Sequence, residues 1–460
     1  MISTICSGRL GAGYRRSVFI ALMIILCGTF CFARAFSLQK LAVIFGVPLY
    51  ITDVFILFAL PLAWEGIKAM EPRVPMMFRG PFLAMFFFGM FYLILGVLVY
   101  RSEFALRGVV LSTYLLFLPL IWVVVERHFN GRIFCVILGV CNLIALVNGA
   151  IIINHWPVPW DGLPFHFAQM RTFNILLYSG IAIAFFLPYG MEKAKGFSRW
   201  ALGALCGLNI ALIVMSGLRT AWVEVICLVV FFFFVFRGRI KKLLTALVVI
   251  FIFILGFLLA QSFWESGRAQ KPAYIERAAG TVLFLDEVLT SNHPPEQIPP
   301  ERRVAYGNIT WRLKIWKATW QAGKTSLIWG HGFRDVLIYD PSAIGRTSPV
   351  RGFAENSGIT PPHNEFMTIF YKMGFLGLAL FLWINGFVFV QGVKALERSG
   401  HASRRVYLAG ALGSLVAWHA MAQSFDVIDS PPTNIFLWVL LGFVLVLVYG
   451  QKAVPEERGA

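Results

Sequence analysis

Long apolar runs alternate with short polar connections along most of the chain. An apolar helix of about 20 residues, rising about 1.5 Å per residue, is long enough to cross about 30 Å of hydrocarbon. The pattern therefore predicts about twelve membrane-spanning helices. Their expected centres are Ile25, Phe55, Leu93, Leu116, Cys141, Ile183, Leu208, Val229, Ile252, Leu380, Gly413 and Leu440.

One polar stretch interrupts this alternation between the ninth and tenth expected spans. It divides the chain into spans 1–9 (residues 1–264), a loop domain (residues 265–363) and spans 10–12 (residues 364–460). No separate soluble domain is expected beyond the loop. A membrane protein with a single large water-facing loop is expected to carry its chemistry there.

Two segments of the loop have helical periodicity, Ile275–Leu289 and Thr310–Gln321. In the second, Arg312, Trp316 and Trp320 recur at intervals of four residues, so they share one face of the helix. An aromatic-rich helix of this kind is expected to lie at the bilayer surface. The later Gly330-His331-Gly332 sequence predicts a tight turn.

The amino-acid composition indicates the class of protein. The chain is 58% apolar, 15% aromatic and only 14% charged, which excludes a soluble globular protein of 460 residues. The net charge of +17 does not indicate nucleic-acid binding, because most cations flank apolar runs, where anionic lipid headgroups attract them. We expect an all-α polytopic membrane protein that contacts membrane lipids and binds no nucleic acid.

Sidedness follows from the basic residues. With a cytoplasmic N-terminus, 21 cations fall in one set of connections, whereas six fall in the opposite short connections. The positive-inside rule then predicts cytoplasmic termini and an external loop. None of the seven cysteines lies in an expected external loop, so we expect no extracytoplasmic disulfide.

Several ordered motifs carry a family resemblance. They are Ser216-Gly217-Leu218-Arg219-Thr220, Trp311-Arg312 with Trp316, Gly330-His331-Gly332-Phe333, Pro362-His363-Asn364-Glu365-Phe366 and Gly374-Phe375-Leu376-Gly377-Leu378, with Pro48-Leu49-Tyr50-Ile51-Thr52-Asp53 before the second span. In their order, spacing and sidedness they resemble the O-antigen ligase and O-antigen polymerase superfamily of bacterial membrane glycosyltransferases. The resemblance covers essentially the whole chain.

The resemblance implies a GT-C-like membrane body in the bacterial inner membrane, with a periplasmic active site and no cofactor. The donor would be an undecaprenyl-diphosphate-linked glycan and the acceptor a hydroxyl of the lipid A core. A polymerase that joins lipid-linked repeat units stays open beside the ligase. Inversion at the anomeric centre is expected from the family and from a single displacement by the hydroxyl.

The residues support that chemistry independently. Arg219 begins an expected helix whose free N–H groups favour anions, and Arg312 supplies a second forked phosphate contact. Together these cations would stabilise a leaving diphosphate without a metal. His363 is the expected general base, because histidine changes its charge near neutral pH. It begins another expected helix with Asn364, and prolines occupy the first turn.

A second, weaker set of residues is expected to contact the diphosphate or sugar. Lys372 belongs to it because ionisable residues inside an expected span are usually functional or paired, and the same reason draws attention to Glu224 outside this set. Glu224 would orient Arg219 or form a structural pair. The weaker substrate-binding set is Asn364, Arg303, Arg302, Trp316 and Lys372.

Simpler interpretations stay open for these residues. Arg219 would snorkel to the headgroups, Arg312 would be an ordinary surface cation on an interfacial helix, and His363 would cap its helix or form a hydrogen bond within the loop. A rival site is formed by Asp426 and Asp429, which would hold a divalent metal or act as a base; turn and N-cap chemistry also explains them.

A function of another class also stays open, that of a polyisoprenoid-linked glycan flippase or other transporter. It predicts a polar cavity through the bilayer centre and repeats related by pseudo-symmetry. This chain instead concentrates its polar residues in one external loop.

Overall fold

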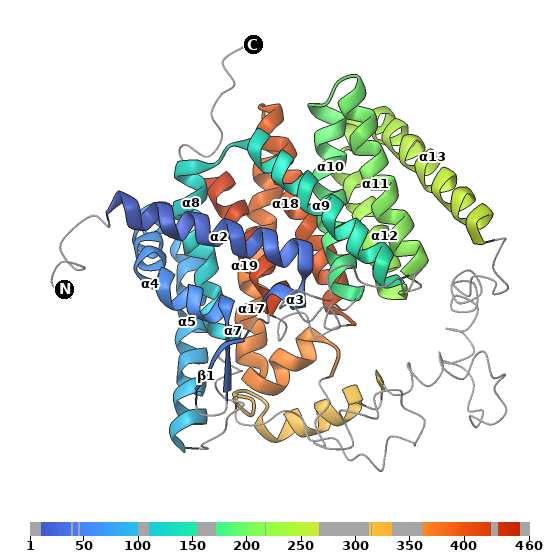
Figure 1. Ribbon diagram of the computed structural model, residues 1–460. Coiled ribbons are helices and arrows are strands. Elements are labelled where there is room, and N and C mark those ends of the chain that lie inside the picture. The colour runs from blue at the N-terminus through green and yellow to red at the C-terminus, as the bar shows by residue number, and fades with distance from the viewer. Residues whose placement is uncertain are drawn as a thin grey trace, which may run out of the picture.

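The protein is described from a computed structural model, shown in Figure 1. The described residues are 11–37, 40–44, 47–99, 110–153, 172–216, 218–265, 312–313, 315–333, 362–424 and 431–450. The expected helix Ile275–Leu289, the residues 340–360 and the pairs Arg302, Arg303 and Asp426, Asp429 lie outside them.

Helices make up almost all of the described chain. In the first half they are α2 (Ala12–Phe32), α3 (Arg34–Ser37), α4 (Ile51–Met70), α5 (Met76–Ile94) continued by η1 (Leu95–Val99), α7 (Val110–Thr113), η2 (Tyr114–Leu116), α8 (Phe117–His128) and α9 (Gly131–Ile153). In the second half they are α10 (Thr172–Glu192), α11 (Phe197–Ser216), α12 (Arg219–Val235), η4 (Arg237–Arg239), α13 (Ile240–Glu265), η6 (Lys324–Ser326), α17 (Glu365–Arg398), α18 (Ala402–Ala422) and α19 (Pro431–Tyr449).

A single small hairpin departs from the helical pattern within the described residues. Strands β1 (Lys40–Ile44) and β2 (Val47–Tyr50) pair antiparallel before α4. The expected all-α body is therefore confirmed apart from this hairpin. At its exit, the backbone N–H of Tyr50 donates to the Asp53 carboxylate at 3.0 Å, which fixes the first turn of α4.

Each of the twelve expected span centres lies in a helix. Among the described residues, six helices are long and apolar enough to cross a membrane, and a seventh span is counted if the pair α12 and α13, bent by 81°, forms one. The remaining apolar helices are shorter or more polar; α4, for example, carries Asp53, Glu65 and Lys68. The chain is a multi-pass membrane protein, and the count of twelve stays a prediction.

Helix α18 is the central helix of the bundle, packed against α10, α12, α17 and α19 (Figure 1). Small residues permit this close packing. Gly410 faces the Phe185 ring, and Gly413 faces Phe232 and Ala184. The outer helices instead expose large apolar side chains; Leu98 is 71% and Phe234 73% exposed, as expected of a surface that contacts lipid tails.

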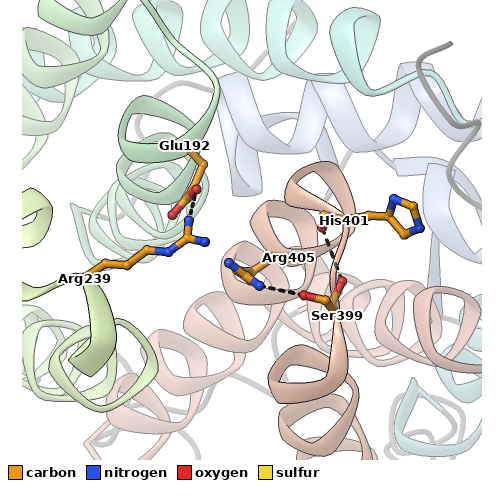
Figure 2. Close-up of polar contacts among 5 residues, drawn as sticks. All are labelled: Glu192, Arg239, Ser399, His401 and Arg405. Atoms are coloured by element: carbon orange, nitrogen blue, oxygen red, sulfur yellow. Dashed lines mark hydrogen bonds and ion pairs between the residues drawn. The ribbon is translucent and has the colours of Figure 1, made fainter. Parts of the chain in front are cut away.

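The expected cytoplasmic connections carry the ion pairs found in the described chain. Arg239 pairs with the buried carboxylate of Glu192 at the end of α10, as Figure 2 shows. Nearby, the Arg405 guanidinium donates to the Ser399 carbonyl at 2.6 Å and closes the turn between α17 and α18. Part of the positive charge on this side is therefore compensated within the protein.

Candidate active site

Helix α12 begins at Arg219, as the sequence predicted. The turn before it is held by Ser216, whose hydroxyl donates to the Ile213 carbonyl at 2.7 Å and accepts from the Leu218 N–H at 3.2 Å. Leu218 has no side chain able to cap the helix, and the Ala221 N–H donates to the Leu218 carbonyl at 3.1 Å, so we expect the N–H groups of residues 219 and 220 to be the ones open to an anion. The Arg219 side chain lies outside the described part of the structure.

Asn364 caps the start of α17 and also links it to α18. Its side-chain oxygen accepts from the Met367 N–H at 3.1 Å, and its amide nitrogen donates to the Gln423 carbonyl at the end of α18, also at 3.1 Å. The interpretation of His363 as the cap is therefore wrong. The prolines do not occupy the first turn either, since Pro362 precedes the cap by two residues. An amide makes the better cap because its oxygen reaches the free N–H groups.

His363 lies just outside α17 with a φ of 49°. Among the described residues, only Ala33 and His363 combine a side chain with a positive φ. Such a backbone conformation is uncommon for residues other than glycine and is retained where neighbouring contacts impose it. Pro362, directly before His363, is buried, and His363 itself is half-buried.

The expected loop helix is present over residues 315–323, and residues 312–313 are helical just before it. It packs against the start of α17. The Trp316 indole N–H donates to the Pro362 carbonyl at 2.8 Å, and the Trp320 ring stacks on Phe370 with centroids 5.1 Å apart. The shared face predicted for these tryptophans is thus the face that contacts α17.

Helix α17 is interrupted at Gly374, where φ is 63° and ψ is −168°. The segment that follows the loop helix fills the break. The N–H groups of His331 and Gly332 donate to the carbonyls of Tyr371 and Lys372, at 2.9 and 2.8 Å. In return, Phe375 and Leu376 donate to the carbonyls of Leu327 and Ile328, at 2.9 and 3.2 Å. The hydrogen bonds that α17 would make across its own break are replaced by bonds to this segment.

The predicted turn at 330–332 belongs to this junction. Gly330 and Gly332 have φ values of 75° and 71°. A side chain on Gly330 would collide with the backbone of Lys372 and Gly374. Lys372 thus contributes its carbonyl to the junction, on the loop side of the break. Its expected role as a substrate contact is untested.

The starts of α12 and α17 lie at the same end of the bundle. Along the seam of α10, α12 and α18, Gly413 faces Phe232, and Gly180 faces both Ala417 and Glu224. Helices α12 and α18 therefore run antiparallel, so the start of α12 lies at the level of Gln423. Since Asn364 binds Gln423, the expected anion-binding helix start and the His363 segment share one end.

Glu224 lies fully buried in that seam. Neither of its carboxylate oxygens has a hydrogen-bond partner among the described residues, and the Arg219 side chain is not among these. Asn174, in the first turn of α10, is also fully buried with both polar atoms unpartnered in the described structure. The sequence drew attention to Glu224 because it is ionisable.

Two pockets of the described structure lie on the expected cytoplasmic side, away from this end. One groove of about 170 Å³ lies between α10, α11 and α13 and is lined mainly by apolar residues with Arg199 and Trp200. Within the described residues, no group of three His, Cys, Asp or Glu side chains is placed to hold a metal ion. The groove is not lined by any of the residues expected to act on substrate.

The arrangement defines a multi-pass membrane protein in which a loop helix packs on the start of a membrane helix beside a strained histidine. Residues 202–382, less than half of the chain, match the family described as O-antigen ligase. The matched stretch contains all of the expected site residues and is similar to that family. No curated protein matches the chain in sequence. At a coarse level the match agrees with a transferase that acts on lipid-linked glycans.

Proposed function

We propose that the protein is an O-antigen ligase of the bacterial inner membrane. It transfers a glycan from an undecaprenyl-diphosphate-linked donor to a hydroxyl of the lipid A core on the periplasmic face. The observation that carries this proposal is the hydrogen bond from Trp316 to Pro362. It joins the helix that follows Arg312 to the residue before His363, so two expected site residues come from segments in direct contact.

The acceptor hydroxyl attacks the anomeric carbon of the donor sugar. Its oxygen forms the new glycosidic bond while the bond from that carbon to the diphosphate oxygen breaks, and the electron pair leaves on the diphosphate. An imidazole nitrogen of His363 takes the hydroxyl proton. A single displacement of this kind inverts the anomeric centre.

Negative charge builds on the diphosphate as that bond breaks. The guanidinium groups of Arg219 and Arg312 would offset it, each through paired N–H groups that match phosphate oxygens. The uncapped start of α12 adds backbone N–H groups beside Arg219. In contrast, the start of α17 is already capped by Asn364, so we assign anion binding mainly to α12.

The proposal is tested with purified protein in liposomes, supplied with lipid-linked O-antigen and lipid A core but no ATP or proton gradient. Transfer under these conditions excludes a pure flippase. Replacing the lipid A core with a second lipid-linked repeat unit separates ligase from polymerase. The ligase product, lipid A core that carries the transferred glycan, is detected as a ladder of bands on a gel.

The site assignment is tested in the same assay. His363→Ala should reduce transfer by at least about 100-fold, and Arg219→Ala by about 100-fold or more, with normal membrane insertion. The matched controls are His401→Ala and Arg199→Ala, exposed residues on the expected cytoplasmic side, which should transfer normally. Near-normal transfer by His363→Ala would remove the general base from the mechanism.

A further inference from the structure

We propose that Trp316 is a positioning residue that holds the backbone of His363, rather than a sugar contact. This inference rests on the proposed function, in which His363 is the base. The Trp316 indole has a single polar atom, its N–H, and that atom is engaged by the Pro362 carbonyl at 2.8 Å. It is therefore not available to a substrate hydroxyl.

The carbonyl that Trp316 holds belongs to the peptide unit joining Pro362 to His363. Rotation of this peptide unit changes the φ of His363, because φ is the rotation about the N–Cα bond of His363, which joins the unit to that residue. An ordinary histidine relaxes to a negative φ, whereas His363 has a φ of 49°. The hydrogen bond from Trp316 thus opposes the relaxation that the backbone would otherwise undergo.

His363 is restrained from its other side as well. Asn364 accepts from the Met367 N–H and donates to Gln423, so the peptide after His363 is fixed to both α17 and α18. With Trp316 acting before it, His363 is the one residue between two anchored neighbours. Its side-chain direction is set by the backbone between those anchors.

Trp316 is itself held in place by the rest of the loop helix. Ile315, beside it, is fully buried against a cluster that includes Tyr371, and Gly323 at the end of the same helix faces the Phe370 ring. The helix is therefore docked along the first part of α17. A docked helix positions the indole more precisely than a mobile loop would.

The test compares Trp316→Phe with Trp320→Phe. Both remove an indole from the same face of the same helix, but the Trp320 ring makes only aromatic contacts, with Phe370 and Phe375, and a cation contact with Lys324 in the described structure. General loss of packing would affect both variants alike. Loss of the Pro362 hydrogen bond affects only Trp316→Phe.

For Trp316→Phe we expect kcat to fall about 10- to 100-fold with KM for the lipid-linked donor little changed, because a displaced base acts on a normally bound substrate. The pH dependence of kcat should keep its wild-type shape, since His363 is still the titrating group. Trp320→Phe should keep wild-type kcat. A raised KM with unchanged kcat in Trp316→Phe would instead establish a sugar contact and overturn the proposal.

Two further results keep the inference separate from the proposed function. Wild-type kcat in Trp316→Phe together with an inactive His363→Ala would overturn the positioning role alone. Normal transfer by His363→Ala would overturn both. Should Trp316→Phe accumulate poorly, Trp316→Tyr is the second variant; its hydroxyl lies farther from the backbone than the indole nitrogen, so the same loss of kcat is expected.

Discussion

His331 and Tyr371 are joined twice, through the backbone and through their rings. The His331 N–H donates to the Tyr371 carbonyl at 2.9 Å, and the two rings stack with centroids 4.8 Å apart and an interplanar angle of 24°. These contacts fasten residues 315–333 to the first part of α17. Because Trp316 lies in the first of these segments and His363 directly precedes the cap of the second, their relative position depends on this junction.

We expect Gly374→Ala to disrupt the junction. Its φ of 63° and ψ of −168° fall in a region that only glycine occupies readily, and an added methyl group would collide with the Ile328 carbonyl. The substitution should lower the free energy of unfolding by about 3 kcal/mol. Thermal unfolding in detergent measures the loss, and transfer activity should fall with it.

Gly386→Ala is the matched control for that variant. Gly386 lies in the same helix, and a methyl group there would meet no atom within 4 Å. Alanine favours helix over glycine, so this variant should be more stable than the wild type by about 0.5–1 kcal/mol. Equal destabilisation by both substitutions would mean that the break at Gly374 has no special requirement for glycine.

The sequence predicted several parts of this junction for sound physical reasons. The four-residue spacing of the loop tryptophans predicted their shared face, and the Gly330-His331-Gly332 turn was expected from its glycines. The break at Gly374 was not predictable, because its hydrogen bonds come from residues 327–332, more than 40 positions earlier. A local pattern in α17 gives no sign of such a distant partner.

The same contrast applies to the candidate site. Arg219 was expected to begin a helix because a polar residue interrupts an apolar sequence, and α12 does begin there. Pro362, His363 and Asn364 were expected to begin a helix, and they do precede α17; the cap is Asn364, so the alternative in which His363 caps the helix is wrong. The hydrogen bond of the Trp316 N–H was also not predictable from the sequence, since a tryptophan in a loop fits a sugar site and a structural contact equally well.

His331→Ala tests whether the junction depends on backbone or side chain. The imidazole lies 2.8 Å from the Ala322 carbonyl and stacks on Tyr371, so its removal should cost about 1 kcal/mol of stability. The backbone bonds of residues 331 and 332 remain, so transfer should continue at a similar rate. A loss of transfer without a matching loss of stability would instead assign His331 to the substrate site.

Asn364→Ala should weaken the start of α17 and its link to α18. Loss of the cap lowers the free energy of unfolding by about 1 kcal/mol, and loss of the bond to Gln423 adds to this. Transfer should fall further than stability explains, because the peptide after His363 is released. Stability and kcat are measured on the same preparation.

Asn130→Ala provides the comparison for Asn364→Ala. Asn130 caps α9 at its start, accepting from the N–H groups of Arg132 and Ile133 at 3.0 and 3.2 Å. It lies in an expected cytoplasmic connection, away from His363. Its replacement should cost a similar amount of stability and leave kcat unchanged; a fall in kcat here would show that any lost cap impairs transfer.

Arg312→Lys asks whether the loop cation binds phosphate as a fork or as a point charge. A lysine keeps the charge but cannot make two parallel N–H contacts to one phosphate group. If Arg312 binds the diphosphate as proposed, transfer should fall about 100-fold. Arg199→Lys, at an exposed position in α11, should have no effect. Wild-type transfer by Arg312→Lys would argue for simple charge attraction.

Glu224→Gln distinguishes two roles for the most deeply buried carboxyl group of the α10, α12 and α18 seam. Both oxygens lack a partner among the described residues, and a carboxylate ion without a partner is costly to bury. Glutamine has nearly the same shape and no charge. If Glu224 only fills the seam, Glu224→Gln should match the wild type in thermal stability and in transfer.

A loss of transfer in Glu224→Gln would instead assign the carboxylate a role at the site. If the Glu224 carboxylate orients the guanidinium of Arg219, one and a half turns earlier in α12, Glu224→Gln should keep its stability and lose transfer, as Arg219→Ala does. Gly180→Ala separates packing from charge, because a methyl group at Gly180 would press directly on the Glu224 carboxyl group. It should therefore destabilise the seam by about 1–3 kcal/mol whichever role Glu224 has.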